Sequence, residues 1–135
     1  VLRGGENIEP APIERAIKGF ECVDSVVVLG QDKKYLSSLI VPVKDAVLAY
    51  AAENDLPSDD YEALLEDPEI LQLFRTAIDA RVNHQAGFRP FEFIFRFTLL
   101  PEPFQVGKEL SGKQEMMRHR INDLYKKEIE ALFAD

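Results

Sequence analysis

Apolar residues recur at helical spacing early in the chain, directly after two prolines. Pro10 and Pro12 stand where a helix would begin, and the apolar positions that follow are Ile13, Ala16, Ile17 and Phe20. This spacing predicts a short amphipathic helix. The preceding segment, residues 2–8, is short and contains two glycines, which favours a turn.

Two apolar runs rich in β-branched residues come next. The first, 23–29, ends at Gly30, and the second, 35–43, closes at Pro42. The link over residues 30–34 has the length and the turn-forming residues of a hairpin. We therefore expect two antiparallel strands, a hairpin near 23–43.

Helical periodicity returns over residues 45–86, where we expect a helical insertion. A first helix ends near Asn54, a second, acidic helix starts after Pro57, and a third begins at Pro68 and stops before Gly87. The third helix has the clearest buried face, made of Ile70, Leu71, Leu73, Phe74, Ala77, Ile78 and Val82.

The segment 91–99 shows the alternation of a strand. One face would carry Phe91, Phe93, Phe95, Phe97 and Leu99, which we interpret as core packing. Pro101 and Pro103 end this strand, and a polar loop leads to a C-terminal helix over 113–133. The fold class is therefore α+β: a small antiparallel or mixed sheet with helices packed on one side, forming a single domain over 1–135.

Charge changes the picture in two places. The chain has 135 residues and a formal net charge of −8. Eight acids and no base lie between residues 53 and 69, so the rest of the chain is balanced, and we expect this acidic segment to face solvent. Residues 105–127 hold six bases against three acids. The overall charge argues against a nucleic-acid partner but not against phosphates near the basic stretch.

Residue types that hold metals or act as nucleophiles are sparse. Cys22 is the single cysteine, and His84 and His119 have no companion ligand at metal-binding spacing, so we expect no metal site. No apolar run is long enough for a transmembrane segment, and a lone cysteine fits a reducing compartment. We expect a cytoplasmic protein and leave peripheral association with a membrane open.

The basic loop over residues 107–115 is the strongest candidate for chemistry. Its glycines permit mobility, and Lys108 and Lys113 place positive charge where a phosphate or carboxylate would develop negative charge. An ordinary solvated loop is the alternative. Gly5 is a second candidate, because a glycine allows another chain or a ligand to approach the backbone closely.

Two stretches together resemble one family. The first is Gly5-Glu6-Asn7-Ile8-Glu9-Pro10 with Pro12-Ile13-Glu14, followed by Gly30-Gln31-Asp32, Tyr35-Leu36 and Leu39-Ile40-Val41-Pro42; the second contains Asn83, Phe91-Glu92, Phe97, Leu99-Leu100, Phe104, Glu109-Leu110-Ser111, Arg118, Ile121 and Tyr125. Their order and spacing resemble the C-terminal domain of the adenylate-forming acyl-CoA synthetases, and in particular of the long-chain fatty-acid–CoA ligases. The resemblance covers essentially the whole chain.

The resemblance implies an ATP-dependent ligase that forms AMP. In this family a large N-terminal domain, absent from this sequence, carries the fatty-acid pocket and most of the ATP site, and the mobile C-terminal domain swings between two poses. One pose serves attack of the acyl carboxylate on ATP, and the other serves attack of CoA on the acyl-adenylate. The implied partners are the large domain, ATP or AMP, CoA and a fatty acid, with Mg²⁺ held mainly by the absent domain. The isolated domain is expected to be inactive.

The resemblance also implies roles for single residues. Gly5 matches the glycine that lines the pantetheine passage, and Glu14 matches a glutamate with a structural role. The family's adenylation lysine falls on Glu115, so we expect Lys113, two residues earlier, to supply the positive charge instead. Two other interpretations remain open: a ligase for a shorter or aromatic acid or an adenylating domain of a peptide synthetase, and a binding or regulatory module that keeps the fold without the chemistry.

Overall fold

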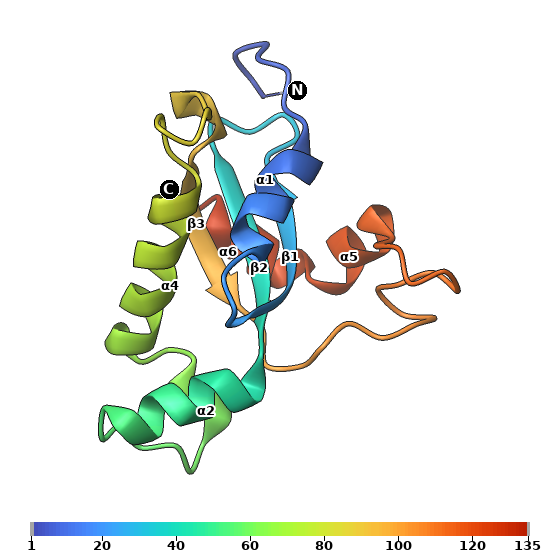
Figure 1. Cartoon of the computed structure of the whole chain (residues 1–135). Coiled ribbons are helices and arrows are strands. Elements are labelled where there is room, and N and C mark those ends of the chain that lie inside the picture. Colours follow the sequence, from blue (N-terminus) through green and yellow to red (C-terminus); the bar gives the residue numbers. More distant parts are fainter. Residues whose placement is uncertain (1, 135) are drawn as a thin grey trace.

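A three-stranded sheet organises residues 2–134, which the computed structural model describes (Figure 1). The strands are β1 (Val23–Leu29), β2 (Leu36–Pro42) and β3 (Ile94–Leu99), and the helices are α1 (Pro10–Lys18), α2 (Lys44–Glu53), α3 (Tyr61–Leu64), α4 (Pro68–Arg81), α5 (Arg118–Leu124) and α6 (Lys126–Leu132). A short 3₁₀ turn, η1 (Pro90–Glu92), precedes β3. The α+β class and the mixed sheet are confirmed.

The expected hairpin is present. The strands β1 and β2 pair antiparallel, and a turn closes through the N–H of Lys33, which donates to the Gly30 carbonyl at 2.9 Å. Asp32 takes a positive φ of 61° inside this turn, a conformation that aspartate tolerates better than most residues. The central strand β2 has β1 on one edge and β3, in parallel, on the other, and it is buried along its whole length because its two faces enter two cores.

The strand β3 is shorter than the pattern predicted. Residues 91–93 do not join the sheet, since η1 replaces the first part of the expected strand. Ile94 pairs with Leu36 but the next pair is Arg96 with Ser37, so Phe95 is the extra residue of an irregularity in the register. Such a bulge reverses the alternation of side chains along a strand.

The bulge overturns one expected contact. Phe97 and Leu99 pack against the main core together with Ile94, whereas Phe95 is 59% exposed. The Phe95 ring instead lies with its centroid 4.6 Å from that of Tyr35, at the surface. The prediction that the whole phenylalanine stripe packs in the core is therefore wrong for Phe95.

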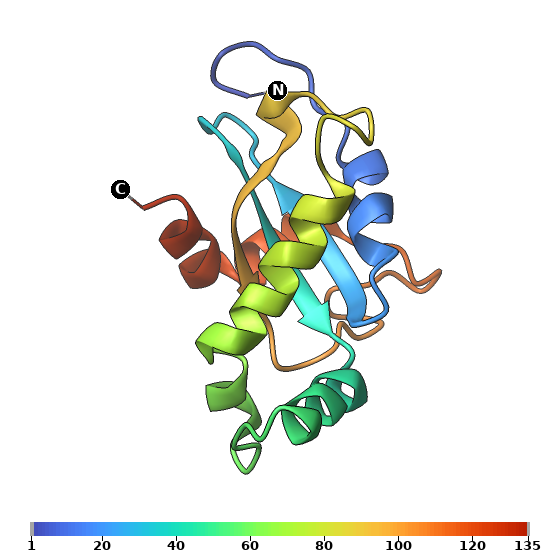
Figure 2. The ribbon, with the colours of Figure 1, turned by 60° about the vertical axis from the view of Figure 1, so that its left-hand side comes forward.

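Helices cover both faces of the sheet, whereas the sequence pattern suggested one. The larger core contains Val26 and Val28 of β1 with residues of α1 and α4, and the smaller core contains Val27 with Ile121 and Leu132 of the last two helices. Figure 2 shows α4 in front of the sheet and the C-terminal helices behind it. Alternate side chains of β1 thus enter opposite cores, as the pleat requires.

The helical insertion over 45–86 is confirmed as α2, α3 and α4. Asp60 and Asp67 cap the last two of these helices, accepting hydrogen bonds from the backbone N–H groups of Ala63 and Glu69 at 3.2 and 2.9 Å. Of the eight acids between 53 and 69, seven are exposed and Asp67 is half-buried. The acidic segment therefore faces solvent, as predicted.

The expected single helix over 113–133 is two helices preceded by a loop. Residues 113–117 are not helical, and Tyr125, with φ −112° and ψ 28°, separates α5 from α6. The apolar spacing of Ile121, Tyr125 and Ile129 continues across this break, so periodicity alone did not reveal it. At the other end, the Leu132 carbonyl accepts a hydrogen bond from the Tyr35 hydroxyl at 3.2 Å, which ties α6 to the hairpin.

Candidate functional site

The loop over residues 105–117 extends from the body of the domain between β3 and α5 (Figure 1). Its root is fastened by Glu109, whose side chain is buried although it is charged. The carboxylate accepts hydrogen bonds from the Gln105 N–H at 3.0 Å and from the Tyr125 hydroxyl at 2.5 Å. The Glu109 carbonyl also accepts from the Met117 N–H at 2.8 Å. One residue thus joins both ends of the loop to the break between α5 and α6.

Hydrogen bonds and a neighbouring charge keep the Glu109 carboxylate ionised despite its burial. Burial alone would raise its pKa, but the Tyr125 hydroxyl, the backbone N–H of Gln105 and the charge of Lys108 together hold the pKa below its usual value. Burial and the neighbouring carboxylate of Glu109 raise the pKa of Tyr125. Glu109 is therefore an anion and Tyr125 a neutral donor at physiological pH.

The tip of the loop is a tight turn around Ser111. The Ser111 hydroxyl oxygen accepts hydrogen bonds from the N–H groups of Lys113 and Glu115, both at 3.3 Å. The backbone N–H of Ser111 donates to the Glu115 carbonyl at 2.8 Å. Gln114 takes a positive φ of 64° at the end of the turn. Lys113 and Glu115 are both exposed, and within residues 2–134 neither side chain has an ion-pair partner. The turn therefore presents one cation and one anion to solvent.

A second buried carboxylate fixes the start of α5. The Glu14 carboxylate of α1 accepts hydrogen bonds from both terminal nitrogens of Arg118, at 2.7 and 2.9 Å. It also accepts a hydrogen bond from the Val28 N–H of β1, at 2.8 Å. Only 9% of the Glu14 side chain is exposed, against 42% for Arg118. The hydrogen bonds to Glu14 raise the pKa of Arg118. Glu14 thus connects three elements, which supports the structural role expected for it.

Gly5 lies in the loop before α1, closed by hydrogen bonds from the Gly5 N–H to the Leu2 carbonyl and from the Leu2 N–H to the Glu6 carbonyl. Its φ is +91°, which disfavours any side chain, and a Cβ there would meet no atom within 4 Å. Space is therefore open in the direction in which a side chain at position 5 would point.

The two sequence-derived candidates do not share one site. The loop with Gly5 and the loop with Lys113 lie apart in both views (Figures 1 and 2). The contact between Glu109 and Tyr125 could not be predicted from the sequence, since a buried acid inside a polar loop leaves no periodic signal.

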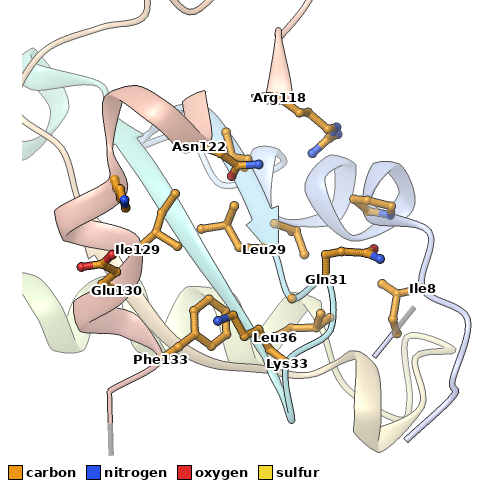
Figure 3. A pocket seen from close by; sticks show the side chains of 15 residues that line it. Ile8, Leu29, Gln31, Lys33, Leu36, Arg118, Asn122, Ile129, Glu130 and Phe133 are labelled. Carbon is orange, nitrogen blue, oxygen red and sulfur yellow. The ribbon is translucent and has the colours of Figure 1, made fainter. Parts of the chain in front are cut away.

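A cavity of about 370 Å³ lies between β1, the hairpin turn and the last two helices (Figure 3). Leu29, Leu36 and Ile129 form an apolar floor, and Arg118 and Lys33 are among the charged residues around it. Neither Gly5 nor Lys113 lines this cavity.

Within residues 2–134, no group of three or more His, Cys, Asp or Glu side chains converges to hold a metal ion. In the same range, every helix is too short or too polar to cross a membrane. Cys22 is buried, and burial together with the neighbouring Glu21 raises the pKa of its thiol, which does not suit a nucleophile.

Similarity to known proteins extends over the whole chain. The chain is 28% identical over 137 residues to the probable acyl-activating enzyme 16, chloroplastic, of Arabidopsis thaliana, covering 98% of this chain and 18% of that protein. It is 26% identical over 157 residues to a long-chain-fatty-acid–CoA ligase of Rattus norvegicus, covering 100% of this chain and 21% of that protein. The chain thus spans about a fifth of the length of the curated relatives it matches.

Solved structures share the fold. The adenylation domain of a carboxylate reductase from Mycobacterium chelonae matches with a TM-score of 0.72 and 26% identity, over 99% of this chain and 19% of that one. The corresponding domain from Segniliparus rugosus, in complex with AMP and a co-purified carboxylic acid, matches with a TM-score of 0.77 and 20% identity, over 98% and 19% of the two chains.

The family assignment rests on a match along the entire sequence. The family model described as AMP-binding enzyme C-terminal domain matches residues 1–135. The mixed sheet with helices on both faces is consistent with that fold. The chain belongs to the family of AMP-binding enzyme C-terminal domains.

Proposed function

We propose that the chain is the C-terminal domain of a long-chain fatty-acid–CoA ligase, with a large N-terminal domain as its partner. The enzyme would form an acyl-adenylate from a fatty acid and ATP, and then transfer the acyl group to CoA. The relatives named as long-chain-fatty-acid–CoA ligases support the substrate class. The isolated domain would be inactive, because the fatty-acid pocket and most of the ATP site belong to the partner domain.

One observation carries the proposed role in adenylation: Lys113 stands exposed at the tip of a loop whose root is fixed by Glu109. As the carboxylate attacks the α-phosphate, negative charge develops on the phosphate oxygens, and an ammonium group held there stabilises it. The fixed root limits the entropy lost when the tip docks on another surface. We infer that Lys113 performs this role although Glu115 occupies the position matched to the family's lysine.

The test is the adenylation half-reaction of the full-length protein, followed by release of pyrophosphate. Lys113→Ala should slow this step by about 10²–10³-fold, the usual cost of removing one group that stabilises a transition state. Lys127→Ala is the matched control, because Lys127 is an exposed lysine outside this loop. Transfer to CoA from supplied acyl-adenylate should remain unchanged in both variants. Unchanged pyrophosphate release in Lys113→Ala would refute the role of Lys113.

A double variant separates the two positions in the turn. The backbone N–H groups of Lys113 and Glu115 both donate to the Ser111 hydroxyl, so the two residues belong to one turn. If a cation anywhere in this turn suffices, Lys113→Ala combined with Glu115→Lys should recover most of the lost adenylation rate. If wild type forms no adenylate with acids of any chain length or with aromatic acids, the chain is instead a binding or regulatory module. Activity confined to short or aromatic acids would assign it to a ligase of that class.

Gly5 is proposed to line the passage of the pantetheine arm in the second pose. Gly5→Ala should slow transfer to CoA and leave adenylation unchanged. Its positive φ means that any side chain also strains the backbone, so a control for strain is needed. Gly87→Ala provides it, because Gly87 has a similar φ of +95° and open space around it. Equal effects of the two variants on transfer would contradict the proposal.

The thiol acceptor can be tested with the same reaction. One relative, 25% identical over 99% of this chain and 16% of its own length, is named a long-chain-fatty-acid–[acyl-carrier-protein] ligase, from Arabidopsis thaliana. CoA and a carrier protein that bears phosphopantetheine present the same reacting thiol. We expect transfer from supplied acyl-adenylate to CoA; transfer only to the carrier protein would change the acceptor and leave the role of Lys113 intact.

A further inference from the structure

The cavity between β1 and the last two helices has the size and lining of a ligand site. Its volume of about 370 Å³ falls within the range usual for small-molecule pockets. The floor is apolar and comes from two parts of the fold, with Leu29 and Leu36 from the hairpin and Ile129 from α6. Figure 3 shows these side chains converging on the same space.

The charge around the cavity is opposite to that of the chain. The lining includes three bases, Arg118, Lys126 and Lys33, and one acid, Glu130, whereas the whole chain carries −8. Arg118 is ion-paired with Glu14, so the excess of positive charge that an anion would meet here, next to apolar surface, comes from Lys33 and Lys126 against Glu130. The floor and the charged residues together match a molecule with an anionic group and an apolar body.

Polar side chains lie at both ends of the cavity. Figure 3 shows Arg118 and Asn122 at that end, with Leu29 and Ile129 between them and Lys33 at the other end. Glu14 uses two of the five N–H donors of the Arg118 guanidinium and holds it in place, so donors remain for a ligand. Lys33 lies with its ammonium 5.4 Å from the centroid of the Phe133 ring. The arrangement favours a carboxylate at Arg118 and Asn122.

We propose that this cavity binds a small amphipathic carboxylate, its charged group at Arg118 and Asn122 and its apolar chain over Leu29 and Ile129. The site is separate from the turn of Lys113, which does not line the cavity. It would therefore act as a second site for a fatty-acid-like molecule. The proposal does not depend on adenylation by the full-length protein, because binding is measured directly.

The first experiment titrates the 135-residue chain and the full-length protein with octanoate, using calorimetry, and follows the backbone amides of the chain by NMR. We expect saturable binding with shifts confined to residues 27–36 and 118–133. Octanol is the matched neutral probe and should bind at least about tenfold more weakly, because it lacks the charge-assisted hydrogen bonds. Equal binding of octanol, or no saturable binding of octanoate to the chain, overturns the proposal.

Paired charge reversals test the position of the site. Lys126→Glu should weaken octanoate binding by about tenfold, whereas Lys127→Glu should change it less than about threefold. Both lysines are exposed and adjacent in α6, but only Lys126 lines the cavity, so the change in net charge is the same. Equal weakening by the two reversals overturns the assignment. Binding by the chain but not by the full-length protein also overturns it, since the large domain would then cover the cavity.

Discussion

Removing the hydroxyl of Tyr125 should loosen the loop that carries Lys113. In Tyr125→Phe the ring keeps its position near Phe104, where the centroids are 6.1 Å apart, while the donor to Glu109 is lost. A hydrogen bond to a charged acceptor contributes about 1.5–3 kcal/mol. Glu109 is only 1% exposed, so water cannot replace the donor unless the loop opens. We therefore expect a loss of about 2–3 kcal/mol in the free energy of unfolding at pH 7.

The loss should depend on pH with a definite sign. The pKa of Glu109 is lower in the folded state, so the pair's contribution is complete above the unfolded pKa of about 4.3 and is lost as pH falls through the folded pKa. The pKa of Tyr125 is raised, so the contribution is also lost as pH rises beyond about 10. The difference between wild type and Tyr125→Phe should thus be largest between these limits and narrow in acid.

Urea unfolding followed by circular dichroism, at neutral pH and in acid, measures this difference. Tyr50→Phe is the control, since within residues 2–134 the Tyr50 hydroxyl has no hydrogen-bond partner. A double-mutant cycle with Glu109→Gln isolates the energy of the pair. A loss in Tyr125→Phe below about 0.5 kcal/mol, the range of an ordinary surface substitution, would refute the reasoning. So would a loss of equal size at every pH.

Four further substitutions test the fold. Glu14→Gln keeps an acceptor for the Val28 N–H but removes the charge from a half-exposed ion pair, and should cost about 1–2 kcal/mol in urea unfolding; a neutral result would mean that the pair does not fix α5. Asp67→Ala removes the cap of α4 and should cost about 1 kcal/mol, which unchanged thermal unfolding would contradict. Phe95→Ala should cost under about 1 kcal/mol and Phe74→Ala about 3–5 kcal/mol; a reversed order would place Phe95 in the core.

The sequence correctly predicted the elements whose signals lie close together along the chain. The hairpin near 23–43 and the long helix from Pro68 were confirmed because turn residues, prolines and apolar spacing act within a few residues of each other. The charge of the acidic segment predicted its exposure for a similar reason, since unpaired carboxylates are costly to bury.

The features that the sequence did not predict depend on contacts between segments that lie far apart along the chain. The bulge at Phe95 arises from pairing with Leu36 and Ser37, so the alternation along 91–99 could not reveal it. Whether helices cover one or both faces of the sheet likewise depends on where α5 and α6 pack. The periodicity of these two helices shows that they have a buried face but not which surface buries it. The burial of Glu109 needs a donor sixteen residues away, and nothing in the sequence of the loop marks it.

Two buried carboxylates together fix the root of the loop, from which the turn at its tip extends. Glu109 closes the loop on itself and on Tyr125, and Glu14 fixes Arg118, the residue where the loop ends and α5 begins. Between these two anchors, the turn of Ser111 places Lys113 away from any partner within residues 2–134. A residue that acts on a substrate held by another domain needs both properties: a defined position and an unused charge. Loosening the root should therefore lower the adenylation rate while transfer to CoA continues, whereas a purely structural loop would lower both rates together.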